Sequence, residues 1–165
     1  MIFATVGTHA QPFARFLAAL ADLDEDVVVQ YGHNDPPAGV REAVAFMPFD
    51  VLNGHMREAD VVVTHAGVGS ALAAMRTGKR AIYVPRRRRH GEHVDDHQVA
   101  VARELDARGL VLAREADAVT AADLASAAGW EVRSRRAVAP FRLGGDRVTG
   151  EVLESHEYGL SRPIG

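Results

Sequence analysis

The stretch VVVTHAGVGS, residues 61–70, decides the fold of this chain. Its three valines, Val61–Val63, form an apolar run that is typical of a buried strand, and Gly67 and Gly69 follow in a turn that leads into a small-residue helix. A strand that ends in a glycine turn and continues as a helix directs backbone N–H groups, and the positive end of the helix dipole, at one point. The stretch therefore predicts a turn suited to a phosphate.

Apolar strands alternate with amphipathic helices along the rest of the chain. Besides the strand above, we expect strands at 2–6, 27–31, 42–46, 80–84 and 110–113, and helices at 13–23, 48–59, 99–108 and 120–128. Strands that are apolar throughout and alternate with helices indicate a parallel sheet covered on both faces. Right-handed crossovers then predict a Rossmann-like, doubly wound α/β domain of about six strands in the order 3-2-1-4-5-6. In that order the loops after strands 1 and 4 meet.

Composition sets the broad class of the protein. The 165 residues are 47% apolar and 25% charged, which is typical of one globular domain. A net charge of -3 argues against a nucleic-acid partner. The lack of cysteine excludes disulfides, thiolate metal ligands and cysteine nucleophiles. The sequence has neither a signal-like start nor an apolar run of the roughly 20 residues that a bilayer requires. We therefore expect a cytoplasmic protein whose membrane contact, if any, comes through a partner or a surface.

Two histidines occupy equivalent places at the ends of predicted strands. His65 precedes the glycine turn, and His9 follows the first strand together with Gln11. Either imidazole could hydrogen-bond a phosphate or a sugar, whereas the alternative for His65 is a half-buried structural role. The glycines have an alternative role too, as a tight turn that only permits close packing. Neither a GxGxxG fingerprint nor a GK[ST] P-loop is present.

A polar loop precedes the predicted helix at 99–108. Asp95, His97 and Gln98 offer the carboxylate, imidazole and amide groups that sugar hydroxyls need. Alternatively, Asp95 or Asp96 could cap the following helix. A third hypothesis is a metal site, because His93 with His97, or with Asp95, has ligand-like spacing. We rank the metal site last, since no further ligand cluster stands out in the sequence.

The run Arg86–Arg89 lies at the start of the same loop. A run of charges usually marks a solvated surface. Here it could steer a nucleotide diphosphate into the site, or contact an anionic membrane surface.

Three motifs, in order and at compatible spacing, resemble one known family. They are MIFATVGTHAQPFARFLAAL (1–20), THAGVGSALAAMRTGKRAIYVPR (64–86) and GEHVDDHQVAVARELDARG (91–109). They resemble the C-terminal, donor-binding half of family 28 glycosyltransferases, which have the GT-B architecture. The likeness extends to about residue 113 and is greatest to small stand-alone catalytic subunits, namely the PssE-type exopolysaccharide subunits and the soluble subunit of the dolichol-pathway N-acetylglucosaminyltransferase.

The resemblance implies a set of site residues. The donor diphosphate would be held by His65, Gly67, Gly69 and Ser70, with Gly7 and Thr8 from the first loop. The donor sugar would contact Asp95, His97 and Gln98. His9 would line the same cleft and is the in-chain candidate for a catalytic role. Many family members have a ribose-binding glutamate where this chain has Ala73, so ribose recognition must come from elsewhere or activity is reduced.

The resemblance also implies an activity and a partner. It indicates an inverting transfer of a sugar from a UDP-sugar to a lipid-linked acceptor in polysaccharide biosynthesis, with no metal or other cofactor. Residues 1–130 would form the donor half-domain, and residues 131–165 a weakly structured or partner-docking extension. The acceptor half would belong to a second, membrane-anchored subunit, which would hold this one at the inner face of the membrane. The alternative is a non-catalytic nucleotide-sugar-binding or regulatory module of the same fold.

Overall fold

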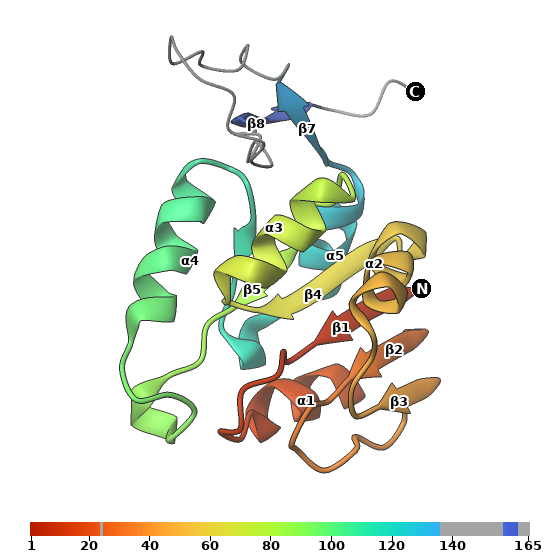
Figure 1. Ribbon diagram of the computed structural model, residues 1–165, viewed down its shortest axis with the longest axis vertical. Helices are drawn as coiled ribbons and strands as arrows, with labels where there is room; N and C mark the ends of the chain where they lie inside the picture. Colours follow the sequence, from red (N-terminus) through yellow and green to blue (C-terminus); the bar gives the residue numbers. More distant parts are fainter. Residues whose placement is uncertain (24, 136–156, 162–165) are drawn as a thin grey trace, which may run out of the picture.

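The computed structural model describes residues 1–23, 25–135 and 157–161. Six strands form one parallel sheet in the order β3-β2-β1-β4-β5-β6, which confirms the predicted order (Figure 1). The strands are β1 (Ile2–Thr5), β2 (Val27–Gln30), β3 (Glu42–Val44), β4 (Val61–His65), β5 (Ile82–Val84) and β6 (Leu112–Ala113). The chain is therefore a doubly wound α/β domain.

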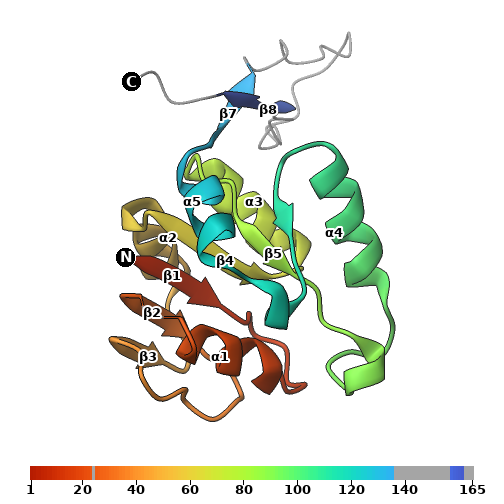
Figure 2. The same ribbon diagram turned by 180° about the vertical axis from the view of Figure 1, so that it is seen from behind.

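Helices cover both faces of the sheet. They are α1 (Ala14–Ala21), α2 (Phe49–Glu58), α3 (Val68–Arg76), α4 (His97–Ala107) and α5 (Ala121–Ala128), with short 3₁₀ turns η1 (Arg88–His90) and η2 (Ala116–Ala118). Helices α1 and α5 lie on one face, whereas α2, α3 and α4 lie on the other (Figures 1 and 2). Among the described helices, none has both the length and the apolar character that crossing a bilayer requires.

The central strands are apolar along most of their length because helices cover both faces of the sheet. In β1, Ile2 and Ala4 pack into the core beneath α1 and α5, while Phe3 packs against Val28 and Val62 beneath α2 and α3. Successive side chains of a strand point to opposite faces, so a sheet that is buried on both sides needs apolar residues at every position. Burial of each large side chain contributes roughly 1.5–3 kcal/mol.

The order of the strands positions the functional site. Strand β1 pairs in parallel with β2 on one side and β4 on the other, where Ile2 lies opposite Val27 and Val61. The chain winds outward in opposite directions from this central pair, so the loops that follow β1 and β4 diverge and leave a crevice at the carboxyl ends of the strands.

The C-terminal part of the chain adds a small separate sheet. Strands β7 (Glu131–Arg135) and β8 (Glu157–Ser161) pair antiparallel, as Figure 1 shows above the main sheet. Both belong to the predicted extension 131–165, and the rest of that extension lies outside the described residues.

Candidate functional site

A cleft of about 260 Å³ opens where β1 and β4 end. It is lined by Thr5, Gly7, Thr8, Gln30, Phe49, Leu52, His65, Gly69, Ser70 and Ala73. Five of the six residues predicted to bind a diphosphate are among these, and the sixth, Gly67, lies directly against the ring of His65. The predicted residues from the two loops are thus brought together.

The imidazole of His65 fits between two glycines. A Cβ atom added to Gly7 would lie 2.4 Å from Cε1 of His65, and one added to Gly67 would lie 2.4 Å from Nε2. Gly7 also has a φ of 75°, a left-handed conformation that side chains other than glycine rarely adopt. Both glycines are therefore required for His65 to occupy its place.

Burial keeps the His65 imidazole neutral. Desolvation, followed by the nearby charge of Arg86, lowers its pKa from 6.5 to about 4. Its Nδ1 atom lies 3.4 Å from the hydroxyl oxygen of Ser70. At neutral pH His65 therefore offers a hydrogen bond to a ligand rather than a positive charge.

Helix α3 presents its first turn to the cleft. Gly67 is the N-cap residue and has no side chain to cap the helix, while Val68 and Gly69 in the first turn are exposed. The free N–H groups of such a turn suit an anion. A Cβ added to Gly69 would meet no other atom of the described residues within 4 Å, so a ligand has room to approach the backbone there.

Buried polar side chains form the floor of the cleft. Gln30 donates a hydrogen bond from Nε2 to the hydroxyl of Thr5 (3.2 Å), and its Oε1 accepts one from the backbone N–H of Met47 (2.9 Å). The Thr5 hydroxyl also accepts from the N–H of Gly7 (3.1 Å). Sequence reasoning missed Gln30, although a glutamine that ends an all-valine strand is an available signal.

Arg86 organises the loop that follows β5. Its side chain is completely buried, with 0% exposed surface. The guanidinium donates to four backbone carbonyls, those of Val6 (3.0 Å), Gln11 (2.8 Å), Pro12 (3.0 Å) and Glu92 (3.4 Å). It therefore joins the loop after β1 to the loop after β5.

The predicted basic surface at Arg86–Arg89 is accordingly only half correct. Arg86 is buried and lies over the ring of Phe13, 4.6 Å from its centroid, and the half-buried Arg87 forms an ion pair with Glu115. Only Arg88 and Arg89 are exposed. The expectation of a uniform solvated run was wrong for Arg86, because long-range carbonyl acceptors compensate for its burial.

A second arginine fastens the same loop to α1. Arg15 donates from Nε and Nη2 to the two carboxylate oxygens of Glu92, each at 3.0 Å. Glu92 is only 3% exposed and also accepts from the backbone N–H of Arg87 at 2.8 Å. The loop is thus docked on the start of α1, so the polar residues that follow are held at a defined position.

The three residues predicted to contact a sugar divide into two kinds. Asp95 and His97 are exposed, and Oδ1 of Asp95 lies 2.5 Å from Nδ1 of His97 and accepts its backbone N–H at 3.1 Å. Gln98 is 5% exposed, and its Oε1 accepts from the backbone N–H of Arg86 at 3.1 Å. The structure therefore gives Gln98 a positioning contact and leaves Asp95 and His97 open to solvent.

Asp96 occupies the N-cap position of α4, as one alternative expected, but its side chain does not cap the helix. It accepts a hydrogen bond from the backbone N–H of Arg88 (3.0 Å) instead. The adjacent Asp95 receives the N–H of His97.

His9 lies beside the loop after β5, and it is not among the residues that line the cleft. Its ring centroid is 5.1 Å from that of His93, and its Nδ1 accepts the backbone N–H of Gln11 at 3.3 Å. Desolvation, followed by the proximity of His93 and Arg86, lowers the pKa of His9 below its ordinary value. A neutral imidazole at this position can accept a proton.

The far wall of the cleft is apolar. Ala73 is buried, Phe49 is 66% exposed, and Leu52 also belongs to the lining. Ala73 supplies no hydrogen-bonding group where many members of the resembled family have a glutamate, so this wall suits a flat or apolar part of a ligand.

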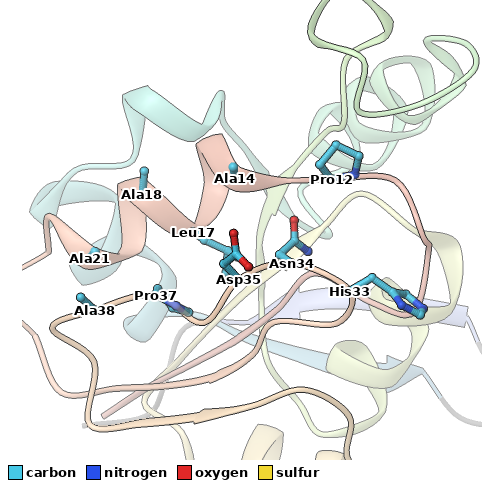
Figure 3. A pocket seen from close by; sticks show the side chains of 10 residues that line it. All are labelled: Pro12, Ala14, Leu17, Ala18, Ala21, His33, Asn34, Asp35, Pro37 and Ala38. Atoms are coloured by element: carbon cyan, nitrogen blue, oxygen red, sulfur yellow. The ribbon is translucent and has the colours of Figure 1, made fainter.

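A larger hollow, of about 380 Å³, lies elsewhere, between α1 and the loop after β2 (Figure 3). Figure 3 shows Ala14, Ala18 and Ala21 along the helix, and Leu17 extending from it toward Asp35 of the loop. Its lining lacks the glycine turn and the buried imidazole of the smaller cleft. Size alone therefore does not mark the functional site.

The comparison with protein families identifies the fold's relatives. Residues 1–125 match the glycosyltransferase family 28 C-terminal domain. The chain belongs to this family. Its described strands and helices form the Rossmann-like half of a GT-B fold, as the sequence predicted.

Two curated relatives carry related names. The chain is 34% identical over 99 residues to the UDP-N-acetylglucosamine transferase subunit ALG13 of Yarrowia lipolytica, a match that covers 55% of this chain and 48% of that protein. It is 36% identical over 86 residues to tylactone mycaminosyltransferase of Streptomyces fradiae, covering 48% of this chain and 18% of that protein. The matches thus span about half of the first relative and less of the second.

Two solved structures share the fold. The glycosyltransferase SnogD of Streptomyces nogalater matches with a TM-score of 0.55 and 24% identity, over 77% of this chain and 34% of that one. The kitacinnamycin glycosyltransferase matches with a TM-score of 0.53 and 22% identity, over 77% of this chain and 33% of that one. In both cases the shared part is about a third of the larger protein.

Proposed function

We propose that this chain is the catalytic subunit of a two-component, inverting glycosyltransferase that moves a sugar from a UDP-sugar to a lipid-linked acceptor in polysaccharide biosynthesis. The observation that carries the proposal is the cleft at the start of α3, in a chain of glycosyltransferase family 28. Exopolysaccharide assembly is the process we favour, because of the sequence resemblance to PssE-type subunits.

The donor is proposed to lie across the carboxyl ends of β1, β4 and β5. Its diphosphate would accept hydrogen bonds from the first-turn N–H groups of α3, from Ser70 and from neutral His65. The nucleoside would occupy the apolar wall near Phe49 and Ala73, and the sugar would extend toward Asp95 and His97. Gln98 would act indirectly, by positioning the loop after β5, since its Oε1 accepts a hydrogen bond from the backbone N–H of Arg86.

The chemistry follows from this placement. When the glycosidic bond breaks, negative charge develops on the leaving diphosphate, and the oriented N–H groups at the start of α3 would stabilise it. This electrostatic stabilisation needs no metal ion. His9 is proposed as the catalytic base or as a donor-positioning group, because it lies in the loop after β1 and next to the loop that carries Asp95.

A partner is proposed to supply the acceptor site. The relative ALG13 is named as a subunit of a UDP-N-acetylglucosamine transferase, which supports a second subunit. A membrane-anchored partner would place the chain at the cytoplasmic face, where exposed Arg88 and Arg89 could approach anionic lipids.

One observation favours a second function. Ala73 lines the cleft and cannot bind a ribose hydroxyl. A chain with weakened nucleotide binding could serve as a non-catalytic nucleotide-sugar-binding or regulatory module instead.

Calorimetric titration with UDP and with several UDP-sugars, alone and with a candidate membrane subunit, tests both functions. We expect UDP to bind, Ser70→Ala to weaken the binding, and Asp95→Asn to change discrimination among UDP-sugars but not affinity for UDP. The absence of UDP binding under both conditions would rule out both functions. Binding without transfer to a lipid acceptor, in the presence of the partner, would favour the regulatory module.

A further inference from the structure

A cluster of three imidazoles and one carboxylate lies where the loop after β1 meets the loop before α4. His93, Asp95 and His97 belong to the loop that ends in α4, and each offers a ligand atom within 4.8 Å of the others. His9 reaches the cluster from the separate loop after β1, and its ring packs against that of His93. Two elements distant in sequence therefore bring nitrogen and oxygen donors to one place.

We propose that His93, Asp95 and His97 bind a divalent transition-metal ion of the zinc class. Imidazole nitrogen and carboxylate oxygen are the ligands that Zn²⁺ and Co²⁺ accept, whereas the harder Mg²⁺ and Ca²⁺ prefer oxygen alone. Three protein ligands leave one position of a tetrahedral ion open, beside His9.

The distances between the donor atoms are suited to an ion. Oδ1 of Asp95 lies 3.2 Å from Nδ1 of His93 and 2.5 Å from Nδ1 of His97. Ligand bonds of about 2.0–2.1 Å in a tetrahedral site place the ligand atoms roughly 3.3 Å apart. The 2.5 Å contact between Asp95 and His97 is a hydrogen bond, so an ion must displace its proton and the exposed His97 side chain must move outward.

The cluster is partly fixed before any ion binds. The His93 side chain is only 9% exposed, and its ring is held between His9 and the edge of His97, whose centroid is 4.6 Å away. Its Nδ1 accepts the backbone N–H of Asp95 only at 3.4 Å, and the single lone pair of that nitrogen must leave this long hydrogen bond to bind an ion. The docking of Glu92 onto Arg15, next to His93 in sequence, holds the loop itself.

The neighbouring charges set a limit on affinity. Exposed Arg88 and Arg89 lie in the same loop and oppose a divalent cation, whereas the carboxylates of Asp95 and Asp96 favour it. We therefore expect a readily exchangeable ion rather than one that is needed for folding.

The metal site shares Asp95 and His97 with the proposed sugar site, so it is tested with the metal alone, without UDP or a UDP-sugar, and its outcome does not depend on whether UDP binds. Titration of the untagged chain with Co²⁺, followed by visible absorption, and with Zn²⁺, followed by calorimetry, measures it directly. We expect one ion per chain and the intense absorption of four-coordinate Co²⁺. Asp95→Asn and His97→Ala should each weaken the affinity by at least about 100-fold, because each removes a ligand, and loss of a group that only orients a ligand already weakens affinity by about 10- to 100-fold.

Matched variants make the experiment decisive. Asp95 and His97 are both exposed, so their replacement should leave the thermal unfolding midpoint unchanged in the absence of metal. His33→Ala and His90→Ala remove exposed histidines outside the cluster and should leave binding intact. The proposal is overturned if no ion binds, or if the His33 and His90 variants lose as much affinity as the Asp95 and His97 variants. His9→Phe keeps an aromatic ring against His93 and removes the ring nitrogens, so loss of binding in this variant would overturn the assignment of three protein ligands.

Discussion

The turn after β4 and the loop after β5 meet at one site but are built in opposite ways. The turn uses backbone: Gly67 and Gly7 leave room for a neutral imidazole, and the first N–H groups of α3 are unobstructed. The loop uses charged side chains: buried Arg86 binds four carbonyls, and Glu92 binds Arg15. A backbone site needs small residues nearby, whereas a long irregular loop needs strong long-range bonds to hold it.

The largest expected effect comes from breaking the loop. Arg86→Gln should lower the free energy of unfolding by at least about 3 kcal/mol, because buried carbonyls lose their donor. Arg86→Lys should be nearly as harmful, since one ammonium group cannot reach carbonyls on two sides. Urea unfolding measures both. The exposed neighbour is the control, and Arg88→Gln should change stability by less than about 0.5 kcal/mol. Equal losses of stability at Arg86 and Arg88 would show that the hydrogen bonds from Arg86 to the four carbonyls do not hold the loop.

The turn should respond to pH through His65. The unfolded chain binds a proton near pH 6.5 and the folded chain only near 4, so His65 adds no pH dependence above pH 6.5 and destabilises the fold as pH falls toward 4. The shift corresponds to a loss of up to about 3 kcal/mol at pH 4. His65→Asn should remove this part of the pH dependence. Stability curves of the two proteins that stay parallel from pH 7 to pH 4 would show that His65 is protonated equally in both states.

A pair of glycines separates backbone strain from contact with His65. Gly7 and Gly91 have similar left-handed φ angles of 75° and 68°, but an added Cβ meets His65 only at Gly7, and at Gly91 meets nothing within 4 Å in the described part of the chain. Gly91→Ala should therefore lower the free energy of unfolding only by the backbone strain, about 1–2 kcal/mol. Gly7→Ala should lower the free energy of unfolding by more than this, as urea unfolding measures. It should also abolish UDP binding, as calorimetry measures. Equal costs would remove the evidence for a tightly fitted imidazole.

The smallest change in stability is expected at Gly69, with the opposite sign. Gly69→Ala should stabilise α3 by about 0.5–1 kcal/mol, because alanine loses less backbone entropy in a helix. It should nevertheless weaken UDP binding, because the new methyl group occupies the space in front of the first turn. Gly54→Ala in α2 is the matched control, since its Cβ position is also open among the described residues and Gly54 does not line the cleft. It should stabilise the protein and leave UDP binding unchanged.

The contrast between the turn after β4, built from neighbouring residues, and the loop after β5, held by long-range bonds, also explains which features could be predicted from the sequence. The strand order and the turn at 64–70 were predictable because they depend on local periodicity and on glycines that are adjacent in the chain. The helix α5 was predicted at 120–128, and its start is marked by two nearby residues, Thr120 and Asp123, which form reciprocal hydrogen bonds as a capping box. Such signals lie within a few residues of one another.

The burial of Arg86 could not be predicted, because its acceptors are as many as 80 residues away and its three neighbours in the run are also arginines. The same holds for Gln98, whose partner is a backbone N–H that sequence does not distinguish from any other. The roles of the site residues in binding and catalysis remain predictions that the variants above can test.

The Arg86 contacts have a consequence for the order of events in folding. They join residues 74 to 80 positions apart, so we expect them to form late, after β1, β4 and β5 have assembled and the intervening chain has lost its loop entropy. Contacts that are absent from the transition state affect the rate of unfolding and leave the rate of folding almost unchanged. Loss of Arg86 should therefore shorten the lifetime of the native protein, while the rate at which the chain refolds stays almost unchanged.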